Sequence, residues 1–244
     1  MSIARSRGRK AFLAVLSLAC LGLVGGIVYV LVAKPKKGGE QLQDVEKDYA
    51  AGVEAYDKGD GKAAAEHFDR ARLRSEKILQ GIENPEDMNT GKSASPELQG
   101  KLHYLRARAI RDSFYAKGLR DGKPLKEADD SSTNEKYRNY TVIPDPKEQN
   151  TAIASLRIAA DRLTKDPDVL RDSLRIELVM TPLAWDRIAI LCQQILEINP
   201  RDGRALYQLA RSEFFQPTLQ SGWRETDPAK RAVARVEKSL QYVR

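Results

Sequence analysis

Two amphipathic helical runs separated by a glycine-containing break are the feature that most limits how this chain can fold. Between residues 44 and 58 the apolar positions recur at intervals of three and four, which places them on one face of a helix. Gly59-Asp60-Gly61 interrupts this pattern, and a second helical run follows from 62 to 80. Glycine tolerates the positive φ angles that a tight turn requires. The stretch therefore predicts an antiparallel helical hairpin.

Small and large side chains follow a fixed spacing in this hairpin. One aromatic residue lies between two alanines on the second helix, and two glycines precede them, in the set Gly52, Gly59, Ala64, Phe68 and Ala71. The spacing resembles that of the tetratricopeptide repeat (TPR) family, whose pattern all five positions match. The resemblance implies an all-α fold, a right-handed superhelical solenoid of stacked hairpins. The family's closing proline falls on Glu76 here, where we expect the helix to continue to about Gln80.

A second match to the repeat pattern lies near the C-terminus. Pro200 ends a helix predicted for residues 186–198, and the family's large, large and small positions of the next first helix fall on Leu206, Leu209 and Ala210. Pro167 and Pro200 are 33 residues apart, close to the repeat period of about 34 residues in this family.

The rest of the body is predicted to complete about four hairpins, with one insertion. Ser95 is a favourable N-cap residue, and the proline after it suits the first turn of a helix. Residues 120–150 are polar and rich in turn residues, which predicts a loosely ordered loop, either solvated or a binding element. The further helices are predicted at 151–167, 168–180, 182–198, 203–215 and 228–243.

An uncharged segment of 23 residues, 11–33, precedes this body. As a helix it spans about 35 Å, enough to cross a bilayer core of about 30 Å. We therefore expect a basic tail at 1–10, a single transmembrane helix at 11–33, a tether at 34–41 and a repeat domain at 42–244. The expected orientation has the N-terminus in the cytoplasm and the body in the periplasm or another extracytoplasmic space.

Two other interpretations of this segment stay open. Ser17-Leu18-Ala19 suits a signal-peptide cleavage site, and Cys20 directly after it suits a lipid-anchored protein. Either would release a secreted or lipid-anchored binding protein. A third interpretation, a buried helix of a soluble protein, explains the length of the uncharged segment less well.

Net charge argues against a nucleic-acid partner. The chain carries +7, and residues 1–37 contain seven basic residues and no acidic ones. The remaining residues therefore hold 34 basic and 34 acidic side chains. No helical stripe of basic residues with interleaved aromatic residues is apparent, so we expect no nucleic-acid binding.

Catalytic chemistry is not indicated by any motif in the chain. Metal-ligand spacings, phosphate-binding glycine loops and nucleophile elbows are lacking, so we expect no enzyme activity, cofactor or metal. His67 and His103 fall in separate repeats, and Cys192 is predicted to be a buried small apolar residue.

The function expected from these patterns is that of a membrane-anchored TPR-like scaffold or assembly protein. Its protein partners are expected to bind in a groove of the helical repeats, and the alternative is an accessory subunit of an enzyme complex. Gly22 with Gly26, or the C-terminal helix, are candidate oligomer contacts. The candidate groove residues lie on predicted first helices: Tyr49, Tyr56, Tyr104 and Tyr207.

Overall fold

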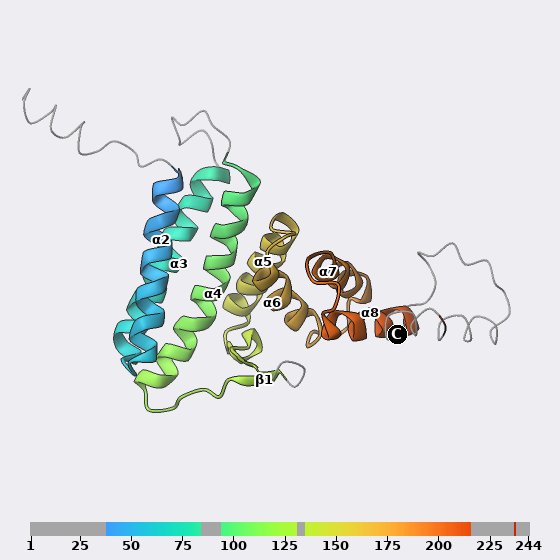
Figure 1. The fold of residues 1–244 in the computed structure, drawn as a ribbon. Helices are drawn as coiled ribbons and strands as arrows, with labels where there is room; N and C mark the ends of the chain where they lie inside the picture. Colours follow the sequence, from blue (N-terminus) through green and yellow to red (C-terminus); the bar gives the residue numbers. More distant parts are fainter. Residues whose placement is uncertain (1–37, 84–93, 131–134, 216–236, 238–244) are drawn as a thin grey trace, which may run out of the picture. The chain divides into compact units, whose positions relative to one another are not determined.

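The computed structural model describes residues 38–83, 94–130, 135–215 and 237, and in this part the protein is helical (Figure 1). The chain divides after Lys37 into two units, and the described residues belong to the second. Its helices are α2 (Gly38–Asp57), α3 (Gly61–Glu83), α4 (Pro96–Arg120), α5 (Pro146–Arg162), α6 (Pro167–Glu177), α7 (Trp185–Ile198) and α8 (Gly203–Phe215). The predicted all-α class is confirmed for these residues, apart from one short strand pair.

The predicted transmembrane segment, 11–33, lies outside the described residues, as do the basic tail and, apart from residue 237, the C-terminal helix predicted at 228–243. None of the helices in the described ranges is long and apolar enough to cross a membrane. The predicted tether is partly wrong, because α2 already begins at Gly38. Glu40 lies in the first turn of this helix, where an acidic side chain interacts favourably with the helix dipole.

The predicted hairpin is formed by α2 and α3. Gly59 adopts a φ of 79° at the turn, and the Asp60 side chain accepts a hydrogen bond from the Ala63 amide at 3.0 Å, which caps α3. Phe68 on α3 is fully buried against Gly52 on α2. A Cβ atom at Gly52 would lie 2.6 Å from the Phe68 ring, so the close approach of the two helices requires glycine here.

The next helix, α4, begins as predicted. The Ser95 hydroxyl accepts a hydrogen bond from the Leu98 amide at 3.1 Å, and Pro96 occupies the first turn. The polar segment after it is more ordered than the prediction of a loose loop at 120–150. It contains the antiparallel strands β1 (Ala128–Asp130) and β2 (Glu135–Tyr137), the 3₁₀ helix η2 (Tyr140–Val142) and the start of α5.

Two apolar side chains explain why this connection between α4 and α5 is ordered. Tyr140 and Ile143 are 2% and 3% exposed and pack among residues of α4 and α5. Asp145 then caps α5 by accepting a hydrogen bond from the Lys147 amide, so the helix begins five residues before the predicted start at Thr151. Helical periodicity is a poor guide to such a segment, because its order comes from tertiary contacts.

Pro167 opens α6, whereas the sequence had suggested that it ends the preceding helix. The Asp166 side chain accepts hydrogen bonds from the Asp168 and Val169 amides, and proline is favourable at the first helical position. Pro200 follows α7, as predicted. The bounds of α8 agree with the predicted 203–215.

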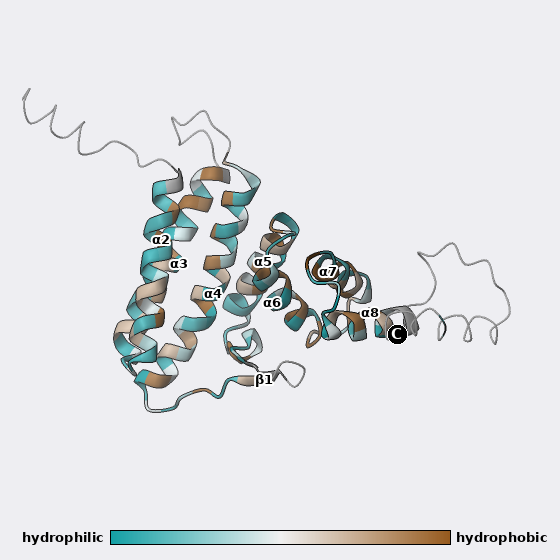
Figure 2. Cartoon of the chain, in the orientation of Figure 1, coloured by the Kyte–Doolittle hydropathy of each residue, from teal (hydrophilic) through white to brown (hydrophobic). Residues whose placement is uncertain are grey.

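Each helix packs against the next along the chain, from α2 to α8, and α2 also contacts α4. In Figure 2, α7 is coloured largely as hydrophobic, and its Ile188, Cys192 and Ile195 are buried in a cluster shared with α5, α6 and α8. The small–large–small spacing of α3 recurs in α5, where Ala152, Leu156 and Ala159 are all buried.

Candidate functional site

A cavity of about 360 Å³ lies where α2, α4 and α6 approach the connection between α4 and α5. Its lining is dominated by charged and tyrosine side chains. The contributing residues are Tyr49 and Val53 from α2, Tyr104, Arg108, Arg111 and Asp112 from α4, Asp168, Arg171, Asp172 and Arg175 from α6, and Glu127, Lys136, Tyr137 and Arg138 from the connection. We call this space the groove.

Asp112 is the most buried charge in the groove, with a side chain 1% exposed. Arg111 donates to it from Nε at 2.8 Å, and Arg138 lies 3.5 Å away. The Tyr49 hydroxyl donates a further hydrogen bond to Asp112 Oδ2. One carboxylate therefore ties α2, α4 and the connection together.

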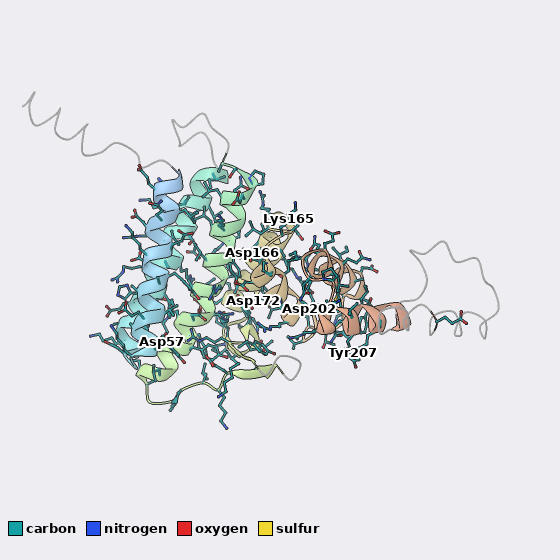
Figure 3. All side chains as sticks on the ribbon, in the orientation of Figure 1. Asp57, Lys165, Asp166, Asp172, Asp202 and Tyr207 are labelled. Carbon is teal, nitrogen blue, oxygen red and sulfur yellow. The ribbon has the colours of Figure 1, made fainter. Side chains whose placement is uncertain are left out.

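A second carboxylate, Asp172, joins α6 to α4. Its Oδ2 accepts hydrogen bonds from the Tyr104 hydroxyl at 3.3 Å and from Arg111 Nη1 at 3.4 Å. Arg175 on the same helix lies 3.3 Å from Oδ1. Figure 3 labels Asp172 among the side chains of this region. The two aspartates, Asp112 and Asp172, thus share Arg111, and their contacts hold α2, α4 and α6 around the groove.

Ionisation at this site follows from burial and from the neighbouring charges. Burial alone would raise the pKa of Asp112, but Arg111 and Arg138 lower it below its usual value. Burial also raises the pKa of the Tyr49 hydroxyl, and the Asp112 charge raises it further. Tyr49 therefore stays protonated and donates its hydrogen bond throughout the physiological range.

Arg108 differs from the other groove arginines in its contacts. Its guanidinium carbon lies 4.8 Å from the Tyr49 ring centroid and 5.3 Å from that of Tyr104, which are cation–π distances. Its Nε is shielded from solvent and has no hydrogen-bond acceptor in the structure. No salt bridge to Arg108 forms among the residues that the structure describes.

The connection between α4 and α5 forms one wall of the groove. Arg175 stacks on Tyr137 with 4.6 Å between the guanidinium carbon and the ring centroid, and Arg138 stacks on Tyr56 at 4.0 Å. A second cavity of about 690 Å³ is lined mostly by the same connection and shares Glu127, Lys136 and Arg138 with the groove. The expected loose loop is therefore a structural part of the site.

The tyrosines expected on the groove are distributed unevenly. Tyr49 and Tyr104 line the groove, and Tyr56 lines the second cavity. Tyr207, labelled in Figure 3, is 57% exposed on α8 and lines neither cavity.

The repeat-motif residues lie elsewhere, because they support the fold. Ala64, Phe68, Ala71, Leu209 and Ala210 are buried in the core.

Sequence reasoning missed the arginines of the groove. On α4, Tyr104, Arg108, Arg111 and Tyr115 recur at intervals of four and three, and this pattern was not singled out from the sequence. Arg111 and Tyr115 are buried, so the pattern is not an exposed basic stripe. The signal was present in this spacing, together with that of Asp168, Arg171, Asp172 and Arg175 on α6. The apolar residues of the same helices gave a stronger signal for the buried core, and the pattern of arginines was overlooked beside it.

Other reactive side chains lie away from the groove. Cys192 is fully buried, as predicted, and burial raises the pKa of its thiol to about 12. His103 is 6% exposed, and burial, with Arg106 and Arg162 nearby, lowers its pKa to about 4. The described part of the chain holds no group of three or more metal-ligating side chains.

Comparison of the chain with protein-family models, with curated proteins and with solved structures finds no match.

Proposed function

We propose that this protein is a membrane-anchored, non-enzymatic scaffold or assembly factor that binds a protein partner in the groove. Residues 11–33 anchor it as a single membrane-spanning helix, and the body from α2 onward forms a right-handed, TPR-like array of helical hairpins. In this scheme α2, α4, α6 and α8 are the first helices of successive hairpins, and α3, α5 and α7 are the second helices.

One observation carries the proposal: alternate helices α2, α4 and α6 contribute side chains to the same cavity. In stacked helical hairpins the first helices line one face, which offers an extended surface to a partner. The sequential packing from α2 to α8, with the additional contact between α2 and α4, supports the same arrangement. The burial of Phe68 against Gly52 supports the repeat character of the first hairpin.

The groove composition supports binding rather than chemistry. Asp112 and Asp172 are engaged by arginines and tyrosine hydroxyls, so they position helices and are not poised to transfer protons. Tyrosine and arginine are also, with tryptophan, the residues most enriched at protein-binding hot spots.

Affinity capture of the tagged full chain from membranes of the source cell, followed by quantitative mass spectrometry, tests this proposal. Val53→Arg places a long side chain in the groove, and Leu73→Arg makes the same change on α3, where Leu73 is 61% exposed. We expect the partner to be recovered with the wild type and with Leu73→Arg but to be depleted with Val53→Arg. Thermal unfolding of both variants verifies that they are folded, and equal recovery with both would exclude the groove.

Extraction of the membranes at alkaline pH tests the anchor separately. We expect the full chain to stay in the membrane pellet and a chain lacking residues 1–37 to be released. A full chain that is released by the same treatment would exclude an integral anchor.

A further inference from the structure

We propose that the groove binds an acidic segment of the partner protein, and that a carboxylate of this segment pairs with Arg108. The inference rests on the proposed function and adds the chemistry of the contact. Among the groove residues, six are arginine or lysine and four are aspartate or glutamate. The empty groove is therefore net positive, and a segment of opposite charge is attracted to it.

Within the described residues, no acidic side chain of the groove forms an ion pair with Arg108, although, despite burial, the Asp112 charge lies near enough to help raise its pKa. Asp112 is engaged by Arg111 and Arg138, and Asp172 by Arg111 and Arg175. Glu127 pairs with Arg138 at 3.2 Å. The fourth acid, Asp168, lies in the first turn of α6, where the helix dipole stabilises its charge.

Arg108 itself is held ready for an anionic ligand. Tyr49 and Tyr104 contact the guanidinium through cation–π interactions, which engage its face. Its Nε is shielded from solvent, so the terminal Nη1 and Nη2 groups are the donors open to a ligand, and no acceptor for them lies among the described residues. A carboxylate accepts hydrogen bonds from two guanidinium N–H groups at once, which gives a strong and directional contact. The two tyrosines are fixed by Asp112 and Asp172, so the guanidinium is positioned before the ligand arrives.

The size and charge pattern of the groove favour a short acidic peptide over nucleic acid. A volume of about 360 Å³ suits a few residues of an extended chain. Asp112 and Asp172 stand among the arginines, and their negative charges oppose a polyanion with closely spaced phosphates. The residues from 38 onward are also formally neutral, so they offer nucleic acid no excess positive charge.

Selection from a phage-displayed library of random linear peptides tests this inference without assuming a partner sequence. The purified full chain in detergent is the target, beside Arg108→Gln and the matched variant Lys101→Gln. Lys101 also lies on α4, but it pairs with Glu97 at 2.9 Å and does not line the groove. Fluorescence anisotropy then measures the Kd of the most enriched peptide for each protein and at increasing salt concentration.

We expect aspartate and glutamate to be enriched on the wild type and on Lys101→Gln, and the Kd to rise about tenfold or more in Arg108→Gln. Enriched peptides without acidic residues, or an unchanged Kd in Arg108→Gln, would overturn the inference and leave the proposed function standing. Tighter binding of a heparin fragment that depends on Arg108 would assign the groove to polyanions and also overturn it. If no peptide is enriched and Val53→Arg captures the same proteins as the wild type, the proposed function fails as well.

Discussion

Single residues decide how closely the helices of this protein approach one another. Gly52 and Phe68 show the principle, because the ring occupies the space that any side chain at residue 52 would need. Gly61 is restricted in a similar way, since a Cβ atom there would lie 2.4 Å from the backbone nitrogen of Arg120 on α4. Both glycines mark points where two helices touch, and the sequence pattern had identified the first of them.

Replacing Gly52 by alanine tests this close approach. We expect the free energy of unfolding to fall by about 1–3 kcal/mol, because the Phe68 ring must leave its packed position. Gly203→Ala is the matched control, since a Cβ atom there would meet no other atom within 4 Å and alanine favours helix. Denaturant titration measures both, and a Gly52→Ala variant as stable as the wild type would contradict the packing.

His103 gives a prediction for the dependence of stability on pH. Burial, with Arg106 and Arg162 nearby, lowers its pKa to about 4 from an ordinary value of 6.5. Between pH 6.5 and pH 4, His103 is therefore protonated in the unfolded chain and neutral in the folded chain. Because the unfolded chain binds more protons in this range, the free energy of unfolding falls as the pH decreases from 6.5 towards 4. Denaturant titrations across this range should show a shallower decrease for His103→Gln, and equal slopes for the two proteins would contradict the assignment.

At the scale of helices, buried charged side chains link neighbouring helices through ion pairs. These ion pairs fix the arrangement of the helices more specifically than apolar packing alone does. Glu177 on α6 has a side chain 1% exposed, and it accepts hydrogen bonds from Arg157 on α5 at 2.7 and 2.8 Å. Arg187 on α7 lies 2.9 Å from the same carboxylate. The Glu177 carboxylate therefore links the three consecutive helices α5, α6 and α7.

Glu177→Gln removes the charge while keeping the shape of this side chain. We expect a loss of about 1–3 kcal/mol in the free energy of unfolding, because two arginines lose their shared carboxylate. Glu54→Gln is the control, since Glu54 and Lys58 form an exposed pair on α2 whose loss we expect to leave stability nearly unchanged. Similar losses for the two variants, measured by urea titration, would show that the buried network adds no stability.

Much of the helical order was predictable because it depends on local signals. The turn at Gly59, the cap at Ser95 and the bounds of α8 follow from residues within a few positions of each feature. The connection between α4 and α5 was not predictable in this way, since Tyr140 and Ile143 gain their order from distant helices. The spacing of the groove arginines along α4 and α6 was visible in the sequence, but only the fold shows that Asp112 on α4 and Asp172 on α6 share Arg111.

At the scale of the whole molecule, we propose that residues 11–33 anchor a helical array in which the alternate helices α2, α4 and α6 line a charged groove. The array explains why small residues recur at helix contacts, and the groove explains why arginines and tyrosines gather on α4 and α6. The central claim of this proposal is that the partner binds on the face lined by α2, α4 and α6.

Site-specific photo-crosslinking of the full chain in its own membrane tests this claim most directly. A photoreactive amino acid at Val53 lies in the groove, and the same amino acid at Leu73 lies on the exposed surface of α3. We expect a partner adduct from residue 53 and none from residue 73. A partner adduct from residue 73, with none from residue 53, would contradict binding in the groove.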